Sequence, residues 1–240
     1  MRRSIGHSEG ALSALQDRIV TCRACPRLVE WREAVAREKV RRFQDQDYWG
    51  KPVPSFGDPR ARLLILGLAP AAHGANRTGR MFTGDSSGDW LYRALHRAGF
   101  ANKSEARHRE DGLVLTDCYI SAVLHCAPPA NKPARDEIHN CREYIANELE
   151  LLGNLRLIVA LGRIAFDSAL VLAGPRQSDG GGAKAATKPK FGHGAEYKMP
   201  NGLTLLASFH PSQQNTFTGK LTEPMLYSIF DRARRLLAAG

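Results

Sequence analysis

The sequence predicts an α/β protein with three layers, in which helices cover both faces of a central parallel sheet. Two observations predict this class. Short runs rich in Leu, Ile and Val, each the length of a buried strand, recur at wide spacing along the chain. Segments with helical patterns separate these runs, and such alternation is typical of parallel sheets. Four runs fit a strand: 62–68, 117–126, 155–161 and 203–208.

The segments between and around these runs account for the helical layers. Pro26 suits the first turn of a helix, and the loop after the second helix is rich in turn residues. No repeat and no domain boundary is visible, so we expect one domain over residues 1–240. The glycine-rich, basic stretch 174–194 is expected to be a mobile loop. The expected helices are 10–20, 26–43, 88–98, 135–152, 164–173 and 223–239.

Charge and composition limit the possible partners. The 240 residues suffice for one sizeable domain, and 34 Lys and Arg against 24 Asp and Glu give a net charge of +10. An excess of this size fits a polyanion partner such as nucleic acid, and it equally fits a protein that is merely basic. No apolar run is long enough to span a bilayer and no signal peptide is visible, so we expect a cytoplasmic protein.

A ligand site is expected beyond the carboxyl ends of the strands, where α/β proteins bind their ligands. The segments that follow the four strands are 67–85, 126–133, 162–166 and 208–219. They should converge although they are far apart in sequence. The first of them begins "GLAPAA", with no acid, base or nucleophile, and it lacks the G-x-x-x-x-G-K-[ST] pattern of a phosphate loop.

Four of the five cysteines suggest a metal site. Cys22 and Cys25 form a C-x-x-C between two expected helices, Cys126 follows a strand, and Cys141 lies on a helix. An odd number of cysteines argues against a disulfide framework. Thiolates suit zinc or an iron–sulfur cluster, and the spacing does not separate the two. Alternatively, Cys126 and Cys141 are small buried apolar residues; Cys118, within a strand, is expected in the core.

Several long motifs resemble one known family. They are "YWGKPVPSFGDP", "GLAPAAHGANRTGRMFTGDSSGDWLY", "CAPPANKP" and "SFHPSQQNTFTGKLT", together with the C-x-x-C. In this order they are similar to the family 5 (type B) uracil-DNA glycosylases of bacteria and archaea. The resemblance implies the uracil-DNA glycosylase fold, with a central parallel sheet of about four strands between two helical layers. It also implies a structural 4Fe-4S cluster rather than zinc, held by Cys22, Cys25, Cys126 and Cys141.

The implied activity is hydrolysis of the bond between deoxyribose and a flipped-out base, with uracil, hypoxanthine and xanthine as substrates in DNA repair. Such a site needs a stacking surface, a donor aimed at the departing base and a positioned water. Phe82 is expected to stack on the base; the alternative is a core phenylalanine. His210, at the end of the last strand, is expected to donate a hydrogen bond to the base.

The residue that holds the water is less evident. Ala69 stands where most members of the superfamily carry Asp, Glu or Asn, so the resemblance places the water elsewhere. We expect it on Asn131, with Asn76 as second choice; for Asn76 a loop-stabilising role fits equally well. Asp85 caps the following helix, or alternatively contacts the base or polarises a water; we favour the cap. Gly67 opens the loop that forms one wall of the pocket.

The strand before Cys126 carries Ser121 and Ala122 where related families have an asparagine that recognises uracil, which implies broad specificity. The segment 210–222 resembles the loop that inserts into the minor groove. Because the superfamily's usual polar residue is absent at Ala69, a catalytically inactive DNA-binding protein remains the alternative. We expect a monomer that binds DNA and no membrane. Any of the basic candidates for DNA contact could equally well be a solvated surface charge. The candidates are Gln213, Gln214, Asn215, Arg77, Arg80, Lys132 and Lys220.

Overall fold

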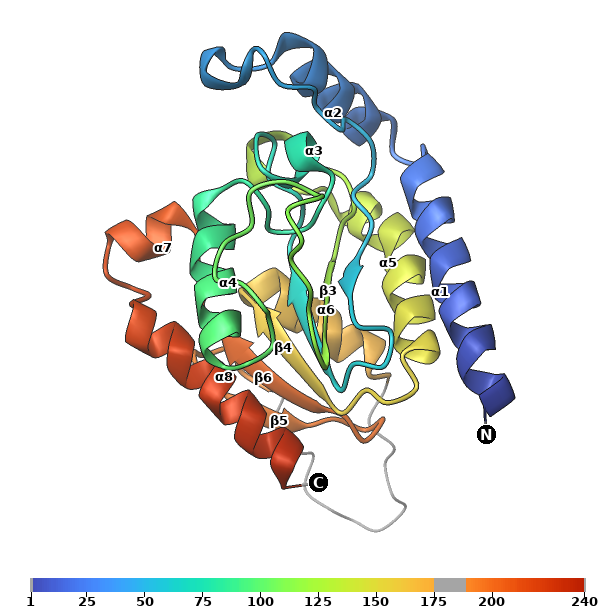
Figure 1. Cartoon of the computed structure of the whole chain (residues 1–240), viewed down its shortest axis with the longest axis vertical. Helices are drawn as coiled ribbons and strands as arrows, with labels where there is room; N and C mark the ends of the chain where they lie inside the picture. Colours follow the sequence, from blue (N-terminus) through green and yellow to red (C-terminus); the bar gives the residue numbers. More distant parts are fainter. Residues whose placement is uncertain (1, 175–188, 240) are drawn as a thin grey trace.

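The computed structural model describes residues 2–174 and 189–239, with side chains from residue 9 onward. Figure 1 shows a central sheet with helices on either side of it, with α1 along one flank and α2 at the top of the view, beyond α3. The expected three-layer α/β architecture is therefore confirmed. Most of the expected mobile loop, 175–188, lies outside the described residues.

The sheet has six strands in the order β1-β3-β2-β4-β6-β5. The four central strands are parallel to one another, as the four apolar runs predicted. The two edge strands pair antiparallel and were not predicted, because two or three residues are too few to show a strand pattern. The strands are β1 (Phe56–Gly57), β2 (Leu63–Gly67), β3 (Cys118–Ala122), β4 (Leu157–Leu161), β5 (Glu196–Lys198) and β6 (Thr204–Ser208).

Six helices lie where the sequence predicted them, and two differences matter for the site. The second helix ends at Glu38 instead of residue 43, because Lys39 takes a positive φ of 53°. Part of the expected loop 210–222 forms a short helix, capped by Ser212. The helices are α1 (Arg2–Thr21), α2 (Pro26–Glu38), α3 (Ala75–Thr78), α4 (Ser86–Arg97), α5 (Arg135–Leu151), α6 (Arg163–Leu172), α7 (Gln213–Phe217) and α8 (Glu223–Ala238), with 3-10 turns η1 (Arg41–Phe43) and η2 (Pro129–Asn131).

The two faces of the sheet are covered differently. Helices α4 and α8 pack on one face, and α5 and α6 on the other, with α1 against α5 (Figure 1). Successive strand residues alternate between these faces, as a pleated strand requires. Within the described residues no helix is both long and apolar enough for a bilayer.

The order of the strands determines where a crevice opens. From β2 the chain moves to β3 on one side and then returns to β4 on the other. The connections after β2 and β4 therefore leave the sheet in opposite directions, which is the position at which α/β proteins bind ligands. Gly67 ends β2 at this point, and Gly162 directly follows β4.

Candidate active site and cysteine cavity

Phe82 and His210 meet at the carboxyl end of the sheet. Their ring centroids are 6.0 Å apart, with 30° between the ring planes. Phe82 has a φ of 52°, which is strained for a bulky residue and is typical of functional sites. Its ring is partly buried against the core, and its remaining exposure leaves the expected stacking role open. The structure thus brings together the two residues predicted for base binding.

Gly67 is required by the position of the Phe82 ring. A Cβ added at Gly67 would lie 2.8 Å from Cζ and 2.9 Å from Cε2 of Phe82. We expect Gly67→Ala to displace the ring and to lower kcat/KM by about 10-fold, since base–aromatic stacking contributes about 1–3 kcal/mol per base. The matched control is Gly153→Ala, whose Cβ would contact nothing within 4 Å. Equal kcat/KM values for the two variants would show that Phe82 does not stack on the base.

His210 is held in place from two sides. An added Cβ at Gly162, which has a φ of 95°, would lie 3.4 Å from Cβ of His210. The carbonyl oxygen of His210 accepts a hydrogen bond of 2.8 Å from Nδ2 of Asn215. Asn215 is half-buried and its Nδ2 is engaged in this contact, so its expected role at the DNA stays a prediction. Burial lowers the pKa of His210 to about 4, so its imidazole is neutral near pH 7.

The low pKa of His210 predicts a pH profile. The ratio kcat/KM reports groups of the free enzyme, so protonation of His210 should change it only as the pH approaches about 4. A histidine with an ordinary pKa would produce a bend in the profile of kcat/KM against pH at about 6.5. We expect no bend there in the profile of base excision, measured in parallel on His210→Gln. A bend near pH about 6.5 that is absent from the variant would contradict the desolvated environment of His210.

Ser121 and Ala122 face opposite sides of the sheet. Oγ of Ser121 donates to Oε2 of Glu148 at 2.6 Å and accepts from Oγ of Ser55 at 2.9 Å, on the side of α5. Ala122 packs in the same core cluster that Phe82 contacts. Ser121 therefore lies away from the pocket, contrary to its expected place at the uracil edge, and the position on the pocket side of the strand carries only a methyl group.

The other loop residues have distinct roles. Asp85 caps α4 through a 3.0 Å hydrogen bond from the Gly88 N–H, as expected, and burial raises its pKa. Asn76 is fully buried, and its Nδ2 donates to the carbonyl oxygens of Arg32 and Ala72. These contacts fit the loop-stabilising alternative, while Oδ1 of Asn76 has no hydrogen-bond partner among the described residues, so its role in holding the water stays a prediction.

Asn131 stays the first candidate for the water. Asn131 is exposed, has a φ of 55°, and its amide has no hydrogen-bond partner among the described residues. The structure gives no contact between Asn131 and Phe82 or His210, so its role stays a prediction. Ala69 is partly buried beside the cluster of apolar residues that includes Cys126.

Two expected phosphate ligands are internal. Arg80 is 3% exposed and pairs with both carboxylate oxygens of Asp111, at 2.8 and 2.7 Å. Arg77 is 8% exposed and donates to the carbonyl oxygens of His73 and Gly84. Both guanidinium groups hold the pocket loop in shape, so their assignment to DNA phosphates is corrected. A basic residue in a loop gives no sequence signal that separates these roles.

The remaining candidates are on the surface. Lys132, Gln213, Gln214 and Lys220 are exposed, which leaves them available to DNA. The short helix α7 also presents Phe217, whose side chain is 81% exposed and had no role in the sequence analysis. An exposed aromatic side chain at the end of α7 suits insertion between bases.

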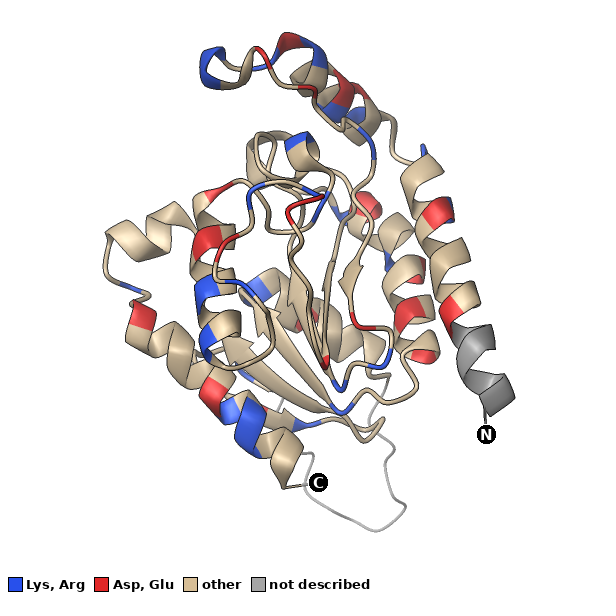
Figure 2. Cartoon of the chain, in the orientation of Figure 1, with Lys and Arg blue, Asp and Glu red and all other residues tan. Residues whose placement is uncertain are grey.

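A basic surface beside the pocket was missed. It comprises Arg41, Arg42, Lys51 and Arg109, which are exposed and form no ion pair with any described residue. Figure 2 shows basic residues on the stretch that follows α2, beyond α3. This stretch is tied to the pocket loop by hydrogen bonds from the N–H groups of 49 and 50 to the carbonyls of 77 and 76. The sequence analysis had placed it in a helix and a loop without a function.

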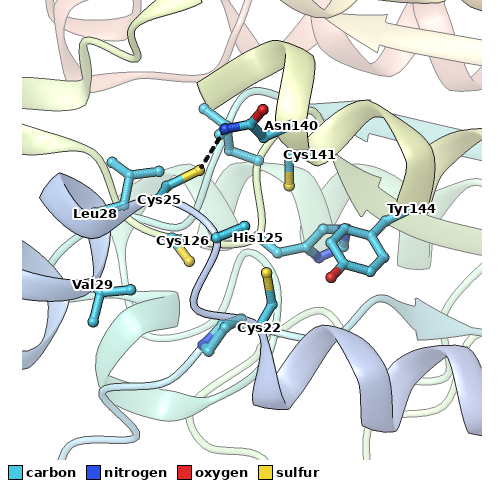
Figure 3. A pocket seen from close by; sticks show the side chains of 12 residues that line it. Cys22, Cys25, Leu28, Val29, His125, Cys126, Asn140, Cys141 and Tyr144 are labelled. Atoms are coloured by element: carbon cyan, nitrogen blue, oxygen red, sulfur yellow. Dashed lines mark hydrogen bonds between the residues drawn. The ribbon is translucent and has the colours of Figure 1, made fainter. Parts of the chain in front are cut away.

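The four cysteines predicted as ligands line one pocket, together with Leu28 and Tyr144. Figure 3 shows Cys22, Cys25, Cys126 and Cys141 around a common space, with Tyr144 and His125 beside them. Cys118 is fully buried in a strand outside this group, as predicted. The hinge between α1 and α2 is thereby brought against the end of β3 and the start of α5.

The chemistry of this cavity fits an iron–sulfur cluster. Burial raises the pKa of the Cys126 thiol to about 11, so thiolates need a compensating positive charge here. In the described part of the chain no three His, Cys, Asp or Glu side chains are close enough for a single metal ion. Four cysteines that line one pocket offer the thiolates that a 4Fe-4S cluster takes, one on each of its four irons.

Comparison with known proteins places the chain in a family. The profile described as the Uracil DNA glycosylase superfamily matches residues 54–234. A protein named type-5 uracil-DNA glycosylase in Mycobacterium tuberculosis is 52% identical over 228 residues, covering 95% of this chain and 82% of the relative. Proteins of the same name are 49% identical in Thermus thermophilus (91% and 94% covered) and 42% identical in Pyrobaculum aerophilum (90% and 89% covered). The chain therefore belongs to the uracil-DNA glycosylase superfamily.

Proposed function

We propose that the protein is a monofunctional uracil-DNA glycosylase that hydrolyses the bond between deoxyribose and a flipped-out uracil during base excision repair. The observation that carries the proposal is the pairing of Phe82 and His210 at the crevice between β2 and β4. The names of the relatives, which cover most of the chain, agree with this activity.

The geometry suggests how excision proceeds. A flipped base stacks on Phe82, and the departing base develops negative charge on its carbonyl oxygens. The neutral imidazole of His210 donates an N–H to that charge without acting as a nucleophile. Asn131 is proposed to orient the attacking water, and an amide contributes through position rather than as a base.

The small residue on the pocket side of β3 supports a broader substrate range. Ala122 offers no side-chain amide to select the edge of uracil, and we propose that hypoxanthine and xanthine are also removed. The test is single-turnover excision from duplexes that carry one uracil, hypoxanthine or xanthine, followed by alkaline strand cleavage. Cleavage at uracil alone would contradict the broad range and leave the uracil activity standing.

The cysteine cavity is proposed to hold a 4Fe-4S cluster through Cys22, Cys25, Cys126 and Cys141. The supporting observations are the four converging cysteines and the buried, mostly apolar lining. Such a cluster would supply a structural cross-link between the amino-terminal helices and the sheet, and the excision steps use none of its chemistry.

DNA is proposed to lie across the basic surface, α7 and the pocket. Each Lys or Arg that contacts a phosphate adds to the salt dependence of binding. We expect Arg41→Ala with Arg42→Ala to weaken DNA binding and to reduce the slope of log K against log salt by about 2, with kcat unchanged. The control is Arg60→Ala, an exposed arginine that pairs with Asp58 and precedes β2, at the opposite end of the strands. An unchanged slope in the double variant would remove this surface from the DNA interface.

A further inference from the structure

Arg32 is a buried charge without a close acidic partner. Its side chain is 2% exposed, and its nearest carboxylate in the described chain, Glu33, is 3.8 Å away. Glu33 is already paired with the exposed Arg23 at 2.5 Å. Burying an uncompensated guanidinium is costly, so the surroundings of Arg32 must supply negative charge from another source.

The other neighbours of this guanidinium are two of the cavity cysteines. Nη1 of Arg32 lies 3.1 Å from Sγ of Cys126. Nη1 and Nη2 also donate to the carbonyl oxygen of Cys22, at 3.4 and 3.3 Å. Thiolates bound to an iron–sulfur cluster would provide the missing negative charge, because the cluster keeps its ligands deprotonated. The position of Arg32 is therefore explained by a charged group in the cavity.

The main chain of Arg32 contacts α3, which lies in the same loop as Phe82. Its carbonyl oxygen accepts a 3.3 Å hydrogen bond from Nδ2 of Asn76, which is fully buried on α3. The carbonyl oxygen of Asn76 in turn accepts a 3.0 Å hydrogen bond from the N–H of Gly50. Since α3 belongs to the loop that ends at Phe82, one residue of α2 contacts a cysteine of the cavity through its side chain and the pocket loop through its backbone.

We propose that Arg32 is a positioning residue that joins the iron–sulfur site to the base pocket. Its guanidinium holds the sulfur of Cys126 and the backbone of Cys22, and its carbonyl fixes the pocket loop through Asn76. The inference rests on the proposed cluster and on the proposed function. Partners that hydrogen-bond to metal ligands commonly affect metal retention by about 10- to 100-fold.

The test compares purified Arg32→Gln, Arg32→Lys and Arg37→Gln, the last an exposed arginine of α2 that pairs with Glu38, by the rate at which a chelator in air bleaches the visible absorption of the cluster. Arg32→Gln is expected to bleach at least about 10-fold faster than the wild type. Arg32→Lys keeps the charge but loses the fork that reaches Cys22, so it should bleach at an intermediate rate. Arg37→Gln should match the wild type. Equal bleaching rates for the wild type and the three variants would overturn the proposal. If Arg32→Gln does not fold, the bleaching rate of Arg32→Lys is compared with that of the wild type instead.

The link to the pocket is tested with Asn76→Ala. This variant removes the donor to the Arg32 carbonyl without touching a cysteine. It should bleach like the wild type and slow single-turnover excision at saturating DNA. Wild-type excision by Asn76→Ala would overturn the link. A wild-type protein that binds iron but excises no base would instead refute the proposed function, and the bleaching rates would still decide the role of the Arg32 side chain.

Discussion

Replacing His210 by alanine is expected to lower kcat for uracil excision by about 10²- to 10³-fold, the usual loss when one donor to a developing negative charge is removed. The imidazole is neutral and desolvated, with a pKa of about 4, so its N–H interacts strongly with charge on the departing base. DNA affinity should change little, because His210 is partly buried and contributes no charge near pH 7.

The experiment separates binding from chemistry. Single-turnover excision gives the chemical rate, and titration of a duplex that carries a non-cleavable uracil analogue gives the dissociation constant. His139→Ala is the control, since His139 is exposed on α5. A His210→Ala protein with the chemical rate of the control would show that another group stabilises the leaving base.

Replacing Cys126 by alanine is expected to remove the proposed cluster, together with its iron and brown colour, and to destabilise the protein. The cluster would cross-link residues 22 and 25 to residues 126 and 141, and long-range cross-links stabilise proteins by about 2–5 kcal/mol. A loss of about 3 kcal/mol lowers the thermal midpoint by roughly 6–12 °C in a domain of this size. The measurement is iron content together with thermal unfolding.

Cys118→Ala is the matched control for this change. Cys118 is also buried, but it lies in β3 outside the cavity. Its substitution should leave the colour and iron content unchanged. Iron retained by the Cys126 variant and lost from the Cys118 variant would contradict the ligand assignment.

The central fold could be predicted because its signals are local. Each parallel strand is a continuous apolar run, and each long helix has an apolar face, so both appear within a short window. The edge strand Phe56–Gly57 and the helix Gln213–Phe217 depend on neighbours or on a single cap, and short elements carry little pattern. The early end of α2 depends on the positive φ of Lys39, and lysine has no conformational preference from which this backbone angle could be predicted.

The site was predicted unevenly for a similar reason. Phe82 and His210 were identified because long motifs surround them, and the structure places them together. Arg77 and Arg80 are basic residues of the kind that contacts DNA. Only the fold shows that their guanidinium groups are hydrogen-bonded to acceptors inside the protein. Burial is a property of distant segments, so the sequence alone could not separate these arginines from exposed ones such as Arg41.

The central claim is that the pocket formed by Phe82 and His210 excises uracil from DNA. The most direct measurement is incubation of the purified protein with a labelled duplex that carries a single uracil, followed by alkaline cleavage of the resulting abasic site. We predict strand cleavage at the uracil and none in the same duplex with thymine at that position. Binding of the uracil duplex without any cleavage would contradict the claim and would identify a DNA-binding protein of the same fold.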